Sequence, residues 1–302
     1  MPERGHFATA LVEAGHLIAT AVPGLHGQGA VLAAIVDAIG GTLRRRLGCG
    51  ADRMRFASVM PRSDLERIGY FRNFPHLLGT VHCFCGDEPA HRAQLVRHDA
   101  GEDWTALQAA SDLVLIPAAC YPVYPALAAR GEVPEEGWLV NVEANCFRRE
   151  PSLDPIRMQS FHMQELVCVG SADVVLAFRD HWLGRGLEAF ADWGLPATVE
   201  PADDPFFGRA AVVMARSQRE KALKFEIRVP VGDADATVAC MSANYHMDSF
   251  GRSMGLRLAD GTVAHSSCIG FGIERVALAL LHTHGLDQAD WPAGVRRGVG
   301  IA

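Results

Sequence analysis

The segment NCFRREPSLDPIRMQSFHMQEL, residues 145–166, places charged side chains between two stretches with the apolar pattern of buried strands. Those stretches are residues 138–149 and 159–169. The two prolines, the serine and the aspartate of EPSLDPIRM favour a turn between them. The sequence therefore predicts an antiparallel β-hairpin.

The charges of this hairpin gather on one surface when each arm is given the two-residue period of a strand. Arg148 and Glu150 share a face of the first arm. Phe161, Met163 and Glu165 share a face of the second. Such groups can hold a nucleoside triphosphate, because guanidinium binds phosphate and an aromatic ring stacks on the base. From these residues alone, a surface hairpin with solvated ion pairs is an equally good interpretation.

A second charged group stands at the start of an apolar helix. The segment CIGFGIERVALAL, residues 268–280, places Gly270 and Gly272 on a strand that must allow a ligand or another backbone to approach closely. Glu274 and Arg275 follow at the start of the helix. An arginine that enters an apolar helix needs an anion to offset its desolvation, which favours a binding site here.

The rest of the chain alternates strands and helices without a βαβ pattern. Neighbouring strands are expected to be antiparallel with helices interspersed, so the predicted class is α+β, and residues 1–302 are interpreted as one domain. Outside the hairpin, the sequence predicts a helix at 27–47, a strand at 52–61, strands within 76–120 around a partly helical polar stretch at 86–112, a helix at 171–195, and strands at 222–231 and 236–243.

The composition is that of an ordinary globular protein. Of the 302 residues, 49% are hydrophobic and 21% charged, so the chain can bury a sizeable core. A formal net charge of −7 argues against a broad nucleic-acid-binding surface, which relies on clustered lysine and arginine. The basic run Arg44–Arg46 is interpreted as a solvated helix end. Without a run of about 18 apolar residues or a signal-peptide pattern, a cytoplasmic protein that uses no membrane is expected.

The eight cysteines lack the regular spacing of a disulfide framework, and reduced thiols are expected. Cys83 and Cys85 would point to opposite faces of a strand, which makes this pair a poor metal-binding motif. Buried structural cysteines are the simplest interpretation of most of the eight.

Two motifs in order give the chain a family resemblance. FRRE followed by Arg157-x-x-x-Phe161 resembles motif 2 of the class II aminoacyl-tRNA synthetases, and GFGIERVALAL resembles their motif 3. With IPAACYPVYP, FHMQELVCVG and SSCIGFGIER, the chain resembles over most of its length the amino acid:carrier protein ligases, relatives of the atypical seryl-tRNA synthetases of methanogens. The resemblance implies an antiparallel sheet on which an amino acid is activated with ATP.

The resemblance also implies which residues bind ATP. Arg148 would hold the α-phosphate, Arg157 would contact the γ-phosphate, and Glu150 would lie near the adenine and the amino acid. Phe161 would stack on the adenine, and Arg275 would cover its opposite face and the γ-phosphate. Mg²⁺ is expected on the triphosphate. Arg148, Glu150 and Arg275 are the implied catalytic residues. The implied ATP-binding set is Arg148, Glu150, Arg157, Phe161, Gly270, Gly272 and Arg275.

Cys268 stands where ordinary motif 3 has one more glycine. In the resembling families this cysteine, an upstream cysteine and a glutamate after motif 2 bind zinc, which implies Zn²⁺ on Cys120, Glu165 and Cys268. Two thiolates and a carboxylate suit zinc with an open position, where the amino group of the substrate would displace water. Without the resemblance, three unrelated buried residues would be the better interpretation, because no compact C-x-x-C spacing exists. His162 would point to the opposite strand face and is not expected to bind the metal.

Two further segments supply candidates for the residues that border the amino acid. Lys224 and Glu226 share a strand face, and Asn244, His246 and Asp248 precede motif 3. Ordinary strand and turn chemistry accounts for most of them, and only Lys224 and Asn244 are assigned to the substrate pocket.

The acceptor is expected to be the phosphopantetheine thiol of a carrier protein. The catalytic elements take up nearly the whole acidic chain, so no tRNA-binding domain and no tRNA partner are expected. A small helical segment at about 171–220 is the candidate carrier-docking region. The helix and strand ending at Pro61 resemble motif 1, which implies a homodimer. Glycine or alanine is the implied substrate, and the sequence does not decide between them.

Two other functions remain open from the sequence. One is a seryl- or glycyl-tRNA synthetase-like enzyme, which would charge tRNA. The other is a non-catalytic amino-acid or nucleotide sensor on the same fold. Loss of the arginine of motif 2 or motif 3 would have favoured the sensor, and both arginines are present.

Overall fold

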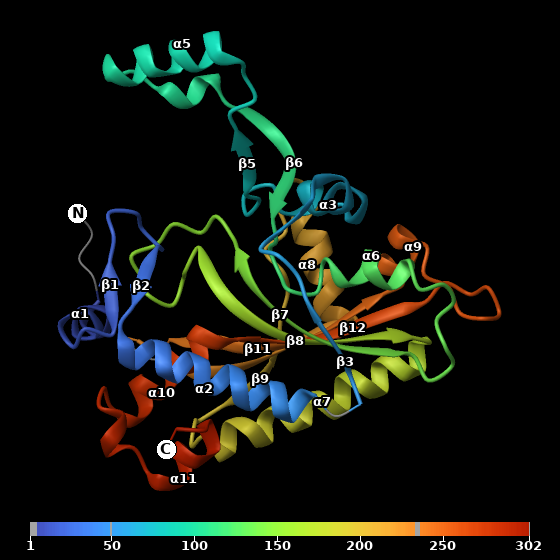
Figure 1. The fold of residues 1–302 in the computed structure, drawn as a ribbon. Coiled ribbons are helices and arrows are strands. Elements are labelled where there is room, and N and C mark those ends of the chain that lie inside the picture. The colour runs from blue at the N-terminus through green and yellow to red at the C-terminus, as the bar shows by residue number, and fades with distance from the viewer. Residues whose placement is uncertain (1–4, 49, 233–235, 302) are drawn as a thin grey trace.

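The computed structural model describes residues 5–48, 50–232 and 236–301. At its centre lies a seven-stranded sheet with the order β3-β7-β8-β12-β11-β10-β9 (Figure 1). β3 runs parallel to β7, and the other neighbours run antiparallel. The predicted α+β class is confirmed. The strands are β3 (Asp52–Arg55), β7 (Trp138–Phe147), β8 (Ser160–Gly170), β9 (Thr198–Pro201), β10 (Lys224–Pro230), β11 (Thr237–Met247) and β12 (His265–Gly272).

The predicted hairpin is confirmed as β7 and β8, which place Cys146 opposite Phe161. β8 pairs on its other edge with β12, so both strands lie in the middle of the sheet. Residues from both faces of β8 and β12 are buried, which explains their nearly continuous apolar sequences. Polar side chains on these two strands are therefore exceptions that need partners.

Long helices cover one face of the sheet, as Figure 1 shows below it. α10 lies between the sheet and α2, so its residues from Val276 to Leu281 are all buried. The side chain of Ser171 accepts a hydrogen bond from the Val174 amide and caps the helix predicted at 171–195. This layer consists of α2 (Ala30–Leu47), α7 (Ala172–Asp192), α10 (Ile273–His284) and α11 (Ala293–Val299).

Shorter elements cover the opposite face. Apolar side chains of these elements, except those of α8, form a second core with that face of the sheet, and a cavity remains above the strands. These elements are α3 (Arg62–Ile68), α4 (Tyr70–Asn73), α6 (Val123–Ala128), α8 (Ala211–Glu220) and α9 (Ser249–Met254). At one end of the sheet, the chain begins with α1 (His6–Glu13), β1 (Leu17–Ala19) and β2 (His26–Gln28).

A small three-stranded sheet of β4 (Val59–Pro61), β6 (Ala109–Leu115) and β5 (Thr80–Cys83) projects from the body with α5 (Glu88–Asp99) (Figure 1). The prediction of one strand at 52–61 is wrong, because this stretch forms β3 and β4 in different sheets. β3 bonds in parallel to β7, whereas β4 bonds to β6, and residues 56–58 cross between them.

The structure also bears on the predictions for the basic run Arg44–Arg46, the cysteines and the segment at 171–220. Arg44 and Arg46 form ion pairs with Glu143 and Asp192, so the basic run is more than a solvated helix end. The described cysteines form no disulfide with one another, and Cys49 lies outside the described residues. The segment at 171–220 is divided, because α7 packs on β11 and β12 whereas α8 lies over the cavity on the other face.

Within the described ranges, no helix is both long enough and apolar enough to cross a membrane.

Candidate active site

A cavity of about 630 Å³ lies between the middle of the sheet and the elements α4, α8 and α9. Arg157 lies in an adjoining cavity of about 540 Å³, which shares Arg275 with the first. One hollow thus gathers predicted residues that are far apart in the chain. Lining the larger cavity are Arg148, Glu150, Phe161, Lys224, Asn244, Gly270, Gly272 and Arg275, with the predicted metal ligands Cys120, Glu165 and Cys268.

The strand register explains why these residues meet. Lys224 on β10 lies opposite Asn244 on β11, which lies opposite Cys268 on β12. Alternate residues of a strand face the same side, so the next row but one also lines the cavity. That second row is Glu226, Ser242, Gly270 and Glu165.

The two glycines of β12 have different reasons to be there. A Cβ at position 270 would lie 3.2 Å from the Cε of Met163 and 3.4 Å from the Cγ of Glu165, so Gly270 leaves room beside the predicted metal ligand. At position 272, the nearest atom would be the Cδ of Arg275 at 3.6 Å, an ordinary contact. The close approach predicted for both glycines is therefore evident only at Gly270.

Cys120, Glu165 and Cys268 place their ligand atoms within 4.8 Å of one another. All three are buried, and Oε1 of Glu165 accepts a hydrogen bond of 2.9 Å from the Ala119 amide. Oε2 of Glu165 is buried without a hydrogen-bond partner among the described residues. Burial, followed by the charge of Cys268, raises the pKa of Glu165 to about 8. A buried carboxylate oxygen beside two thiols is what a bound cation would satisfy, so this donor set fits a metal.

Asn244 and His246 contact the same thiol. Nδ2 of Asn244 donates a hydrogen bond of 3.4 Å to Sγ of Cys268, and Nε2 of His246 lies 3.5 Å from that sulfur. Nδ1 of His246 lies 3.1 Å from Oγ of Ser266. The hydrogen bond between the thiols of Cys120 and Cys268 and the neighbouring His246 lower the pKa of Cys268 against the effect of burial. The thiol of Cys268 therefore lies in a pocket that favours the thiolate.

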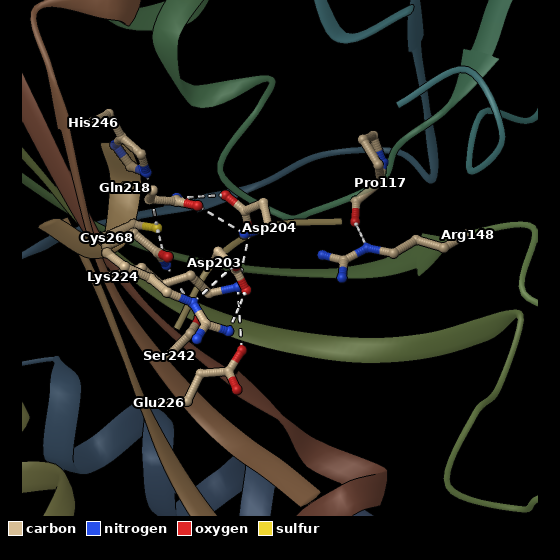
Figure 2. Close-up of polar contacts among 12 residues, drawn as sticks. Pro117, Arg148, Asp203, Asp204, Gln218, Lys224, Glu226, Ser242, His246 and Cys268 are labelled. Atoms are coloured by element: carbon tan, nitrogen blue, oxygen red, sulfur yellow. Dashed lines mark hydrogen bonds and ion pairs between the residues drawn. The ribbon is translucent and has the colours of Figure 1, made fainter. Parts of the chain in front are cut away.

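Arg148 lies at the end of β7 beside the ring of Phe161. Its Nε donates a hydrogen bond of 2.9 Å to the carbonyl of Pro117, as Figure 2 shows, and its amide donates to the carbonyl of Gln159. The guanidinium carbon lies 5.4 Å from the centre of the Phe161 ring. A phosphate-binding group and a flat apolar surface thus lie side by side in the cavity.

Arg275 is held by the backbone. Its Nε donates to the carbonyl of Ile156 at 3.2 Å and its NH1 to the carbonyl of Ala239 at 3.1 Å. These carbonyls offset part of the desolvation that the sequence interpretation assigned to an anion alone. The contact with Ile156 also ties the helix start to the loop of the β7–β8 hairpin.

Glu274, next to Arg275, also lines the cavity and is held by residues at its edge. Its carboxylate accepts hydrogen bonds from the His162 amide at 2.9 Å and from Nε2 of Gln28 at 3.2 Å, and it pairs with the His162 ring. This bond with Glu274 raises the pKa of His162. His162 thus points away from the predicted metal ligands, as its strand position predicts.

Lys224 is almost completely buried between two carboxylates. Nζ lies 2.8 Å from Oδ1 of Asp204 and 3.2 Å from Oε1 of Glu226 (Figure 2). Burial lowers the pKa of Lys224, but the charges of Asp204 and Glu226 outweigh it and raise this pKa. Because two carboxylates already contact the ammonium of Lys224, it does not need a negatively charged group on the substrate.

Comparison with curated proteins shows to which family the chain belongs. The chain is 48% identical over 280 residues, 93% of its length and 84% of the relative's, to amino acid--[acyl-carrier-protein] ligase 2 of Bradyrhizobium diazoefficiens. Ligase 1 of the same organism is 44% identical over 92% of this chain and 85% of that protein. The chain belongs to the amino acid--[acyl-carrier-protein] ligase family. No protein-family model matches it.

More distant relatives of this ligase family member are synthetases. The type-2 serine--tRNA ligase of Methanococcus aeolicus is 27% identical over 62% of this chain and 37% of its own. Among solved structures, the seryl-tRNA synthetase of M. kandleri in complex with tRNASec has a TM-score of 0.84 at 20% identity, over 98% of this chain and 60% of that one. The cytoplasmic serine-tRNA ligase of Naegleria fowleri has a TM-score of 0.72 at 13% identity, over 99% and 67%. These structures share the class II synthetase fold.

Sequence reasoning about this ligase missed two residues of the cavity. His246 was left as turn chemistry, although it lies two residues after Asn244; an irregularity in the β11–β12 register between Tyr245 and Met247 decides its direction. Asp204 lies in the loop between β9 and α8, and only the fold brings it to Lys224. The two-residue period of a strand predicts the direction of side chains on strands, and it says nothing about a loop residue such as Asp204.

Proposed function

We propose that this protein joins a small amino acid to ATP as an aminoacyl-adenylate and transfers it to the phosphopantetheine thiol of a carrier protein. The observation that carries the proposal is one cavity lined by two groups of residues. One group is Arg148, Phe161 and Arg275, and the other is Cys120, Glu165 and Cys268. The family relationship, at 48% identity, supports the same reaction.

In the first step, a carboxylate oxygen of the amino acid attacks the α-phosphorus of ATP and pyrophosphate leaves. Arg148, whose guanidinium carbon lies 5.4 Å from the centre of the Phe161 ring, would bind the α-phosphate and neutralise charge that develops there, and Phe161 would stack on the adenine. Arg275 would cover the other face of the adenine, with Glu150 beside it. Arg157, on the adjoining cavity, would bind the γ-phosphate of a magnesium-bound ATP.

With the second group of residues, the chain would hold and orient the amino acid. Cys120, Glu165 and Cys268 would bind Zn²⁺, which when present supplies an electron-pair acceptor for the substrate's amino group. Asn244 would hold the Cys268 sulfur in place through its hydrogen bond. Fixing the amino group aims the carboxylate at the α-phosphate.

In the second step, the carrier's thiol attacks the carbonyl carbon of the adenylate. A carbon–sulfur bond forms, the bond from that carbon to the phosphate oxygen breaks, AMP leaves and the thiol proton passes to solvent. The energy is already stored in the mixed anhydride, so this step needs mainly orientation of the thiol.

The surroundings of the metal ligands favour a small side chain such as that of glycine or alanine. The ring of His246 contacts Cys268 and packs edge-on against Phe250, with 4.9 Å between the ring centres. Phe250 stacks on Tyr124 at 3.8 Å. This aromatic wall limits the volume beside the substrate's α-carbon.

The carrier is proposed to dock on α8 and the loop before it. The exposed fractions of Val212 and Val213 are 78% and 70%, and that of Phe207 is 58%. Arg209 and Arg216 flank these apolar side chains, and a small acidic carrier would complement their charge. We call Phe207, Arg209, Val212, Val213 and Arg216 the α8 patch.

Two further parts of the proposal concern assembly and acceptor. A homodimer through α2 and β3 is proposed because β3 lies at the edge of the sheet, where a second copy can approach. No tRNA is proposed as a partner, since a chain of net charge −7 suits a protein acceptor better than a polyanion. Light scattering and tRNA charging assays test these two points.

The deciding experiment is amino-acid-dependent ATP–pyrophosphate exchange with each of the twenty amino acids. Transfer to a phosphopantetheinylated carrier and to total tRNA is assayed alongside. Exchange with glycine or alanine together with a loaded carrier is the expected result. Charged tRNA would support a tRNA synthetase instead, and folded, metal-bound protein without any exchange would support a sensor.

A further inference from the structure

Helix α8 is held on the molecule by polar contacts instead of a hydrophobic core. None of its residues, Ala211–Glu220, is buried, and no side chain caps its N-terminus at Ala210. Its C-terminal half makes the contacts that hold it: Gln218 and Arg219 reach back to Asp204 and Asp203 in the preceding loop. These side-chain hydrogen bonds join α8 to the loop before it, and the backbone bond from the Leu223 amide to the Gln218 carbonyl joins it to the start of β10.

Gln218 and Asp204 form a reciprocal pair (Figure 2). Nε2 of Gln218 donates to Oδ2 of Asp204 at 2.8 Å, and the amide of Asp204 donates to Oε1 of Gln218 at 2.7 Å. The other carboxylate oxygen of Asp204 accepts from Nζ of Lys224 at 2.8 Å. Asp204 thus uses one oxygen for the helix and the other for the sheet.

Strand pairing relates Lys224 to the proposed metal site. Lys224 lies opposite Asn244, and Asn244 donates to the sulfur of Cys268. Glu226 holds the ammonium of Lys224 from a second side. Among the described residues, side-chain contacts thus run from Gln218 through Asp204 to Lys224 and Glu226, and strand pairing places Lys224 opposite Asn244 in the row proposed to hold the amino acid.

We infer that Gln218 is a positioning residue for the transfer step: through Asp204 and Lys224, it holds α8 at a set distance and angle from the adenylate. This inference rests on the proposed function. The residues proposed to act on ATP lie on β7, β8 and α10, and none of them has a hydrogen bond or ion pair with Gln218 among the described residues. Loss of the pair should misplace the thiol that arrives past α8 and leave adenylate formation intact.

The test compares Gln218→Ala with Arg219→Ala in the full-length, metal-loaded protein. Arg219 makes a matched control, because it ties α8 to the same loop through Asp203 but does not line the cavity. For Gln218→Ala, we expect exchange within about twofold of wild type and a kcat for carrier loading lowered about 10- to 100-fold, with the KM for the carrier changed less than about threefold. Arg219→Ala should load the carrier nearly as well as wild type.

A second readout follows the helix itself. Backbone amide hydrogen exchange in residues 211–220 should be faster in Gln218→Ala than in Arg219→Ala, because the half-buried pair contributes more than the exposed one. An unchanged loading kcat would overturn the inference, and so would a raised carrier KM at unchanged kcat, which would make Gln218 a docking contact. If the wild-type protein neither exchanges pyrophosphate nor loads the carrier, the proposed function is wrong. That result is distinguishable from a failure of the inference about Gln218, in which the wild-type protein is active.

Discussion

Asn244 and Cys268 lie opposite each other on β11 and β12, and Nδ2 of Asn244 donates a hydrogen bond to the Cys268 sulfur at 3.4 Å. The residue assigned to the substrate pocket and a proposed metal ligand are therefore in direct contact. Removing the amide and removing the thiol should have separable effects on metal content and on amino-acid binding.

Asn244→Ala should keep the metal and weaken the use of the amino acid. The three ligand side chains remain, but one donor to the sulfur is lost, which at about 1.5–2.5 kcal/mol lowers kcat/KM for the amino acid roughly 10- to 70-fold. Exchange kinetics combined with elemental analysis of the same sample check this. Loss of the metal in this variant would contradict the separation of the two roles.

Cys268→Ala should lose both stoichiometric zinc and pyrophosphate exchange. Removal of one of the three protein ligands leaves only one thiolate and one carboxylate, which bind Zn²⁺ poorly. Cys168→Ala is the matched control, since Cys168 is also a buried cysteine but does not line the cavity. Elemental analysis after dialysis decides the matter: zinc that stayed stoichiometric in Cys268→Ala would show the assignment to be wrong.

Arg148→Lys should lower exchange about 10²- to 10³-fold. A lysine keeps the charge but lacks the planar fork that can hold the Pro117 carbonyl and a phosphate at once. Arg149→Lys serves as the control, because Arg149 is exposed and does not line the cavity. Circular dichroism verifies that both variants fold, and equal activity of the two would refute the role of Arg148.

Acid should remove the stabilisation that Glu143 provides. Glu143 pairs with Arg44 at 2.7 Å, Arg53 at 3.2 Å and Arg55, which joins α2, β3 and β7. Burial alone would raise the pKa of Glu143, but the bonds from Arg55 and Arg44 outweigh it and lower this pKa to about 2. Because the folded-state pKa lies below the ordinary value of 4.5, the stabilisation is present above about pH 4.5 and is lost as the pH falls toward 2.

The measurement is urea unfolding of wild type and Glu143→Gln at several pH values. At pH 7 the variant should be less stable by about 1–2 kcal/mol, after allowance for solvent screening of the exposed arginines. The difference in the free energy of unfolding should narrow between pH 4.5 and pH 3. A difference that stayed constant over this range would rule out the ionised carboxylate as its source.

Much of the fold could be predicted because its signals are local. The prolines between β7 and β8 fix a turn, the two-residue period places Phe161 and Glu165 on one face, and Ser171 marks the start of α7. The strand at 52–61 was mispredicted because its division depends on two different partner strands, β7 and β6. Strand pairing over long separations has no signature within the strand itself.

From the sequence alone came the α+β class, the two segments that resemble motifs 2 and 3 of the class II synthetases, and the cysteine that replaces a motif 3 glycine. The family resemblance, and not the residues by themselves, grouped Cys120 with Glu165 and Cys268, and the tertiary structure brings their ligand atoms within 4.8 Å of one another. Only the tertiary structure turned His246 toward the Cys268 sulfur and brought Asp204 to Lys224. The physical reason is that a side chain on a strand takes its direction from backbone periodicity. A side chain on a loop or at a bulge takes its direction from the packing of the whole chain around it.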